Sequence, residues 1–173
     1  MSCMESGKVR VVFLDYDDVV NTFLWSWKAG KWICRYGFPE DNAVNNAQAV
    51  QWVSEFCEKY GYAVVVSSSW RFEDNYEQCL RNGGLRETIK ILGKTKSLPG
   101  RSRGDEIGQW LSEHPEVEQY LIFDNQTDMG EYKDHLVWCS SSAGFREEEF
   151  REAERLHNRW TSSKVFDRRN DSV

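Results

Sequence analysis

The chain has 173 residues, 22 of them basic and 28 acidic, and a formal net charge of −6. This length is typical of one domain, and the negative charge argues against nucleic-acid binding by bulk electrostatics, although it leaves room for a local basic groove. Hydrophobic residues make up 40% and charged residues 29% of the chain, which excludes disorder over most of its length.

The longest apolar runs fall far short of the roughly 20 residues that a membrane helix needs. The N-terminal residues also lack the apolar stretch of a secretory signal. Five cysteines are scattered without a CxxC pair, which disfavours a zinc site or a disulfide framework. We therefore expect a cytoplasmic protein that does not bind membranes, and the sequence gives no sign of an obligate protein partner.

Short apolar runs rich in β-branched residues alternate with stretches of helical periodicity. The runs predict buried strands at 9–14, 62–66, 120–123 and 135–139, and the periodic stretches predict helices at 43–60, 72–82, 104–113 and 146–160. Residues 85–100 fit either a strand or the end of a helix. The alternation predicts an α/β fold, a three-layer Rossmann-like parallel sheet with helices on both faces.

Residues 21–42 differ from the rest because they hold Trp25, Trp27 and Trp32 without a sustained period. They predict a short, aromatic-rich flap or cap insertion. Its tryptophans either pack over the sheet edge or stack on a substrate ring. We expect a single catalytic domain over residues 1–160 that includes this flap, followed by a polar tail at 161–173.

Three predicted strands end in residues that suit phosphate and metal chemistry. These are Asp15 and Asp17, then Ser67 and Ser68, then Asp124 and Asp128. The carboxyl ends of strands in such sheets collect functional groups. Carboxylates two residues apart leave a strand on the same side, so one of the first pair can attack phosphorus while the other transfers a proton.

Carboxylates this close repel each other, which favours a hard cation between them. Asp124, with Asp128, would complete the oxygen shell of that cation. The hydroxyl of Ser67 suits a non-bridging phosphate oxygen, and Arg103, at the start of a predicted helix, suits the neutralisation of developing charge. Taken singly, these residues also fit helix caps and solvated strand exits.

The four elements, in order, resemble the haloacid dehalogenase-like (HAD) phosphohydrolase superfamily. Residues 11–20 resemble its motif I, 64–67 its motif II and 121–128 its motif IV, with a basic motif III residue before the third strand. More narrowly, the segments Ser68-Ser-Trp-Arg71, Gly93-Lys-Thr95 and 103–111 resemble the small HAD domains of multidomain RNA-repair proteins.

The resemblance implies a role for each matching residue. Asp15 would be the nucleophile and a Mg²⁺ ligand, and Asp17 the general acid and base with its backbone carbonyl on the metal. Asp124 would be a further Mg²⁺ ligand. Asn125 stands where many relatives have a second aspartate, so Asp128 would take that supporting role.

Two assignments stay open at the sequence level. Either Ser67 or Ser68 would bind phosphate. Four cations fall in the window for motif III, and Arg103 is preferred because a helix start follows it; the others are Lys94, Lys96 and Arg101. Arg71 fits either a structural ion pair or substrate binding, and Trp70 is expected to pack in the core.

The functional prediction is a Mg²⁺-dependent phosphomonoesterase that works through an aspartyl-phosphate. A short flap leaves an open site, so the expected substrate is a nucleotide or a phosphorylated nucleic-acid end. The alternative is a non-catalytic module that keeps the fold as a binding platform. The complete set of Asp15, Asp17 and Asp124 favours the enzyme.

Overall fold

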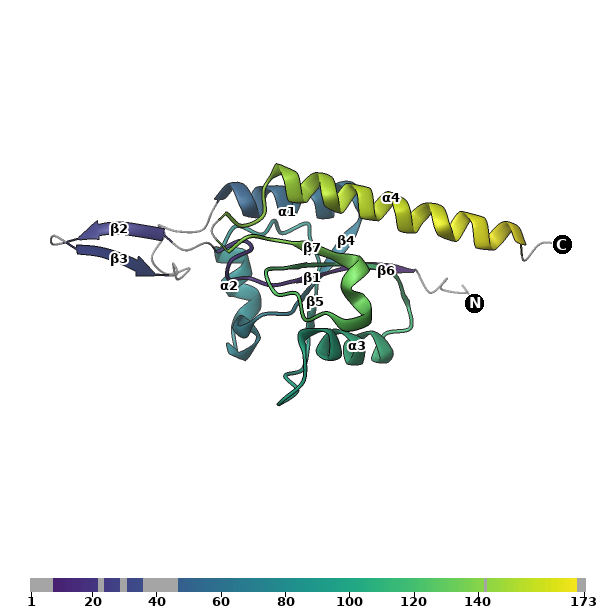
Figure 1. The fold of residues 1–173 in the computed structure, drawn as a ribbon, viewed down its shortest axis with the longest axis horizontal. Coiled ribbons are helices and arrows are strands. Elements are labelled where there is room, and N and C mark those ends of the chain that lie inside the picture. Colours follow the sequence, from purple (N-terminus) through teal and green to yellow (C-terminus); the bar gives the residue numbers. More distant parts are fainter. Residues whose placement is uncertain (1–7, 22–23, 29–30, 36–46, 142, 171–173) are drawn as a thin grey trace.

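The computed structural model describes residues 8–21, 24–28, 31–35, 47–141 and 143–170. Its centre is a five-stranded sheet in the order β5-β4-β1-β6-β7, in which every neighbouring pair is parallel (Figure 1). The strands are β1 Val9–Leu14, β4 Tyr62–Val66, β5 Ile91–Lys94, β6 Val117–Asp124 and β7 Leu136–Trp138. The predicted α/β fold with a parallel sheet is confirmed.

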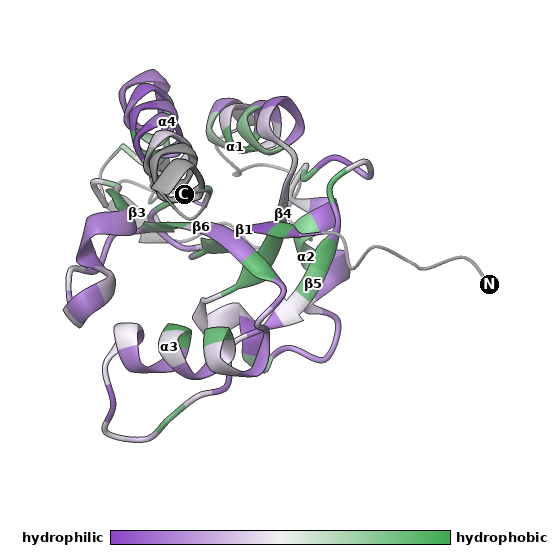
Figure 2. Cartoon of the chain, turned by 90° about the vertical axis from the view of Figure 1, so that its right-hand side faces the viewer, coloured by the Kyte–Doolittle hydropathy of each residue, from purple (hydrophilic) through white to green (hydrophobic). Residues whose placement is uncertain are grey.

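Side chains of the central strands alternate between two apolar layers, as strand geometry requires. Val12 and Leu14 of β1 lie in the larger layer, under helices α1 (Ala47–Tyr60) and α4 (Glu147–Asn170). Val11 and Phe13 point to the other face, where α3 (Arg103–Glu113) packs with Ile107 and Trp110. Figure 2 shows α1 and α4 on one side of the sheet and α3 on the other, so the three predicted layers are present.

Several helical boundaries differ from the sequence-based expectation. The helix expected at 72–82 is split into a 3₁₀ helix η2 (Ser69–Phe72) and a short α2 (Tyr76–Asn82), because Glu73 takes an extended conformation between them. The final helix was expected to end at 160 but runs to Asn170, and no glycine or proline after Trp160 gives a stop signal. The ambiguous segment 85–100 contributes β5, which pairs with β4.

The predicted flap contains an antiparallel hairpin of β2 (Leu24–Lys28) and β3 (Lys31–Arg35). This hairpin forms a separate two-stranded sheet, drawn outside the five-stranded sheet in Figure 1. The side chains of Trp25, Trp27 and Trp32 lie outside the described part of the structure. Across the described residues, no helix combines the length and the apolar character of a membrane span.

Candidate active site

The carboxyl ends of the three central strands lie side by side. The backbone N–H of Ser67 donates to the carbonyl of Leu14, and the N–H of Asp15 donates to the carbonyl of Phe123, each at 2.9 Å. These two bonds extend the register of β4, β1 and β6 by one residue. They place Ser67, Asp15 and Asp124 next to one another, as the sequence predicted for strand ends of a parallel sheet.

Asp15 and Asp124 are both buried, with 6% and 1% of their surfaces exposed. Burial raises the pKa of Asp15, and the neighbouring Asp124 carboxylate raises it further, whereas Arg103 lowers it. Burial likewise raises the pKa of Asp124, against the lowering effect of Arg103. Two carboxylates in one poorly hydrated site therefore need added positive charge to stay ionised together.

Arg103 supplies part of that charge from the first residue of α3. Its Nε lies 3.3 Å from Asp124 Oδ2 and its Nη2 lies 3.9 Å from Asp15 Oδ1. Its Nη1 lies 3.3 Å from Ser67 Oγ and also donates to the Ser67 carbonyl. One guanidinium thus reaches all three strand ends.

The sequence around Arg103 explains why α3 begins here. Ser102 Oγ accepts from the Asp105 N–H at 3.1 Å, and Asp105 Oδ2 accepts from the Ser102 N–H at 3.1 Å, which makes a reciprocal capping box. Gly104 lets the helix approach the loop after β6, because a Cβ there would lie 2.3 Å from the Met129 carbonyl oxygen. Both features bring Arg103 close to Asp124.

The other candidate cations of this window point elsewhere. Lys94 Nζ donates to the Arg71 carbonyl at 2.6 Å, and Lys96 pairs with Glu113 at 2.7 Å. Arg101 is exposed before the helix. Among these four cations, Arg103 is the one that the described contacts bring to Asp15 and Asp124.

Both candidate serines are fully buried at the end of β4. Ser67 faces Arg103, whereas the Ser68 hydroxyl donates to Asp15, and the Ser68 Oγ accepts from the Trp70 N–H at 3.3 Å. The structure therefore brings both hydroxyls to the site, and either can meet a phosphate oxygen.

Asp17 is held by two residues that the sequence did not single out for this purpose. Its Oδ1 accepts from Trp70 Nε1 at 3.0 Å and from Asn21 Nδ2 at 2.9 Å. Burial raises the pKa of Asp17, with these two hydrogen bonds acting against the rise. Trp70 does pack on the core, 4.6 Å from the ring of Tyr16, but it also orients Asp17.

Asp128 lies near Asp124, whose pKa its charge raises, but its own hydrogen bonds are with the start of α3. It is exposed, its Oδ2 accepts from the Arg103 N–H at 3.2 Å, and its carbonyl accepts from the Gly104 N–H at 3.2 Å. Asp128 therefore fastens the loop after β6 to the start of α3. Asn125 binds the loop that follows β1, because its Nδ2 donates to Asp18 Oδ2 at 2.8 Å.

The site suits a magnesium ion through the buried carboxylates of Asp15 and Asp124. Within the described residues, no group of three or more acidic, histidine or cysteine side chains is arranged to hold a metal. However, Asp124 Oδ2 is buried and has no hydrogen-bond partner among the described residues, since its contact with Arg103 Nε is an ion pair without hydrogen-bond geometry. Mg²⁺ commonly takes one or two carboxylates together with water and phosphate oxygens, which fits Asp15 and Asp124.

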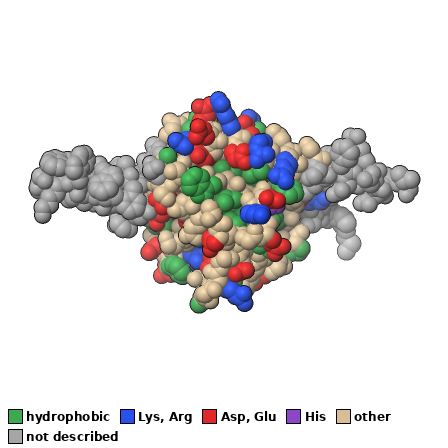
Figure 3. Space-filling model, in the orientation of Figure 1, with side chains coloured by type: hydrophobic (Ala, Val, Ile, Leu, Met, Phe, Trp, Pro, Cys, Tyr) green, Lys and Arg blue, Asp and Glu red, His purple; other side chains and the backbone are tan. Residues whose placement is uncertain are grey.

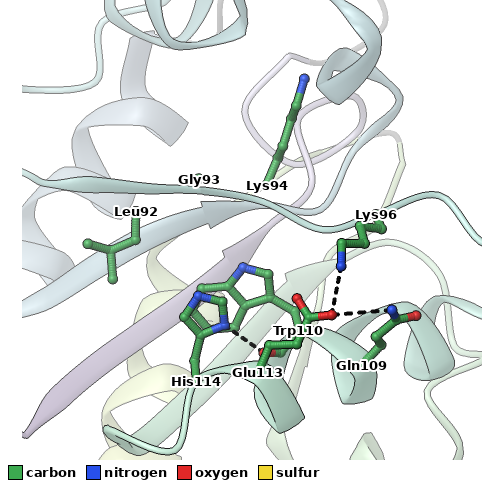
Figure 4. Close-up of a pocket in the computed structure, with 8 residues that line it drawn as sticks. All are labelled: Leu92, Gly93, Lys94, Lys96, Gln109, Trp110, Glu113 and His114. Atoms are coloured by element: carbon green, nitrogen blue, oxygen red, sulfur yellow. Dashed lines mark hydrogen bonds and ion pairs between the residues drawn. The ribbon is translucent and has the colours of Figure 1, made fainter.

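A hollow of about 190 Å³ lies between β5 and α3. In Figure 4 its polar side chains bind one another: Glu113 accepts from Lys96 at 2.7 Å and from Gln109 at 3.4 Å, and His114 Nδ1 lies 2.7 Å from the Trp110 carbonyl. The His114 ring also stacks on Trp110 at 3.6 Å. These polar groups already bind one another, so we place the candidate active site at Asp15 and not in this hollow.

A parallel sheet with paired carboxylates, hydroxyls and a guanidinium at its carboxyl end defines a HAD-like domain. The model of a family described as the HAD domain in Swiss Army Knife RNA repair proteins matches residues 11–150, most of the chain. The chain belongs to this family, as its sequence motifs predicted. A comparison with individually curated proteins found no match.

Proposed function

We propose that this domain is a Mg²⁺-dependent phosphomonoesterase that forms an aspartyl-phosphate on Asp15. The observation that carries the proposal is the buried cluster of Asp15, Asp124 and Arg103 beside the hydroxyls of Ser67 and Ser68. The membership of the chain in a HAD family supports the same chemistry.

In the first step, an Asp15 carboxylate oxygen attacks phosphorus while the bond from phosphorus to the leaving oxygen breaks. Asp17, whose pKa is raised by burial, gives its proton to that leaving oxygen. Arg103 and one of the two serine hydroxyls bind the equatorial phosphate oxygens. Bound Mg²⁺, held by Asp15 and Asp124, would supply the positive charge that keeps both carboxylates ionised beside a phosphate dianion.

In the second step, water attacks the phosphorus of the aspartyl-phosphate and gives a proton to the Asp17 carboxylate. The bond between phosphorus and the Asp15 oxygen breaks, so that inorganic phosphate leaves and Asp15 is again a carboxylate. Trp70 and Asn21 hold Asp17 in one orientation through both transfers.

The proposed substrate is a nucleotide or a phosphorylated nucleic-acid end. The family description, which names RNA repair proteins, supports this class of substrate. On the described face in Figure 3, acidic and basic side chains are mixed rather than gathered into a broad basic surface. The protein would therefore recognise the substrate close to its phosphate, and not through contacts along an extended nucleic-acid backbone.

Free Cys57, Cys79 and Cys139 support a reducing, cytoplasmic location.

The test measures phosphate release from an aryl phosphate by the wild-type protein and Asp15→Asn, with Mg²⁺ and with excess chelator. We expect Asp15→Asn to lose at least about a thousandfold in kcat because the attacking charge is gone. Asp134→Asn, an exposed position, is the matched control. Equal activity in Asp15→Asn and wild type would refute the mechanism, and an inactive wild type would favour a binding module.

A further inference from the structure

Trp138 is an exposed aromatic side chain at the end of β7. It has 53% of its surface exposed, whereas the core residue before it, Val137, is completely buried. Single exposed apolar side chains are common on protein surfaces, so what distinguishes Trp138 is its place beside the candidate site rather than its exposure alone.

The strand register puts Trp138 in the same row as the candidate active site. Its Cα pairs with that of Asp124 across β6 and β7, and Asp15 is bonded to the neighbouring position of β6. Adjacent strands lie about 4.8 Å apart, so the Cα atoms of Asp15 and Trp138 are separated by roughly 10 Å. A substrate bound at Asp15 could therefore reach Trp138 along the carboxyl ends of the strands.

The side chain of Trp138 also lies on the face of the sheet that carries Arg103. Successive residues of a strand point to opposite faces. Val137 belongs to the layer under α1 and α4, so Trp138 points to the α3 side. Its Nε1 donates to the Asn125 carbonyl at 2.9 Å, which fixes the indole beside the residue that follows Asp124.

We infer that Trp138 is a substrate-specificity residue that stacks on the nucleobase next to the scissile phosphate. The inference rests on the proposed phosphatase function and specifies which part of the substrate the site recognises. With the phosphate at Asp15 and Arg103, the sugar spans β6, and the base reaches the exposed face of the indole. Every base has a flat π face, so this contact selects nucleotides over other phosphate esters without selecting a sequence.

The test compares kcat/KM for a nucleoside monophosphate with that for ribose 5-phosphate, which has the same phosphate and sugar without a base. Trp138→Ala should lower kcat/KM for the nucleotide by about 5- to 150-fold, the range expected from loss of one stacked base, and leave kcat/KM for ribose 5-phosphate unchanged. Trp138→Phe should recover much of the loss. Leu92→Ala, which truncates an exposed apolar side chain on the opposite edge strand, should affect neither substrate.

A binding measurement separates this inference from the proposed function. In the Asp15→Asn background, calorimetry with a nucleoside monophosphate should show the same loss of affinity on Trp138→Ala, whether or not the wild type turns over. Short oligonucleotides with a 3′- or 5′-phosphate extend the comparison from free nucleotides to strand ends. Equal affinity with and without the Trp138 ring, or no binding of any of these ligands, overturns the inference; an inactive wild type overturns only the phosphatase.

Discussion

The indole Nε1 of Trp70 lies 3.0 Å from Asp17 Oδ1 and donates a hydrogen bond to it. The same oxygen accepts from Asn21, so two donors from different segments fix the orientation of one half-buried carboxyl group. Trp70 belongs to η2, immediately after β4, and Asp17 follows β1. The hydrogen bond therefore links Asp17, the candidate proton-transfer residue, to the segment after β4 that also carries Ser67 and Ser68.

Replacing Trp70 with Phe tests the positioning role of that hydrogen bond. The ring remains while the donor is lost, so Asp17 should sample more orientations. Because small displacements of a reacting group cost up to about a hundredfold in rate, we expect kcat to fall about ten- to a hundredfold with little change in KM. Steady-state kinetics on an aryl phosphate measure both constants.

Trp52→Phe is the matched control for this substitution, since Trp52 is half-buried against Phe150 on α4. It should leave kcat within about a factor of two if the effect at Trp70 belongs to Asp17. Equal losses in the two variants would mean that removing any half-buried indole has the same consequence. In that case Trp70 is a packing residue only.

A second prediction concerns the buried ion pair between Arg71 and Glu106. The guanidinium binds the carboxylate through two bonds, of 2.8 and 2.9 Å, and donates to Thr95 at 3.0 Å. Both partners are less than one-tenth exposed. Glu106→Gln leaves the Arg71 charge buried without a counter-charge, so the free energy of unfolding should fall by about 3–5 kcal/mol.

The exposed pair of Lys96 and Glu113 provides the comparison for urea denaturation. Its two side chains are 63% and 41% exposed, so Glu113→Gln should cost less than about 1 kcal/mol. A cost for Glu106→Gln no larger than for Glu113→Gln would contradict a structural role of the buried pair. Arg71 would then be free to serve the substrate, the other interpretation that the sequence allowed.

The sequence predicted those parts of the site that are encoded by local pattern. Asp15, Ser67 and Asp124 each follow an apolar run, and the carboxyl ends of parallel strands meet at one edge. Arg103 could only be preferred among four cations, because its contact with Asp124 depends on the close approach of α3 at Gly104. No local signal in the sequence reports such an approach.

Trp70 and Asn21 were missed as partners of Asp17 for a related reason. A tryptophan between a serine and an arginine is consistent with core packing, and its polar atom becomes important only when two strand ends meet. The asparagine lies four residues from Asp17, a spacing typical of ordinary turn chemistry. Asn125 carried a clearer signal as a departure from the family pattern, and the structure shows that it binds Asp18.

A third prediction concerns magnesium and stability without any turnover. Mg²⁺ at about 100 times its dissociation constant should stabilise the protein by about 2.7 kcal/mol, which corresponds to a rise of roughly 5–10 °C in Tm for a chain of this size. Asp124→Asn should abolish the rise because it removes one of the two buried carboxylates. Thermal unfolding with MgCl₂, against NaCl of the same ionic strength, measures this effect.

Asp128→Asn distinguishes the two interpretations of Asp128 in the same experiment. If Asp128 holds the start of α3, as its bond to the Arg103 N–H indicates, the variant should keep a Tm rise of similar size. Loss of the rise in Asp128→Asn would mean that Asp128 serves the metal, as the sequence predicted. A full rise in Asp124→Asn would instead contradict the two-carboxylate site.

The last prediction concerns His157, which is buried between α4 and the sheet. Its Nδ1 lies 3.0 Å from the Tyr62 hydroxyl and 3.3 Å from Gln119 Nε2, and its ring packs 4.3 Å from Tyr60. Burial, and then the positive charge of Arg10, lower the pKa of His157, while Glu154 acts in the opposite direction. The folded protein therefore favours the neutral imidazole.

As the pH falls, the unfolded chain protonates this histidine near its ordinary pKa of 6.5, and the folded protein protonates it only at a lower pH. Stability from His157 is therefore complete above about pH 6.5 and is lost as the pH falls toward the lowered pKa of the folded state. Urea denaturation at pH 7.5 and 5.5 should show a smaller loss of unfolding free energy for His157→Gln than for wild type. Asp15 and Asp124 titrate equally in the wild type and in His157→Gln, so the difference in pH dependence between these two proteins comes from His157. Equal pH dependence of the free energy of unfolding in both proteins would show that the folded state does not change the proton affinity of His157.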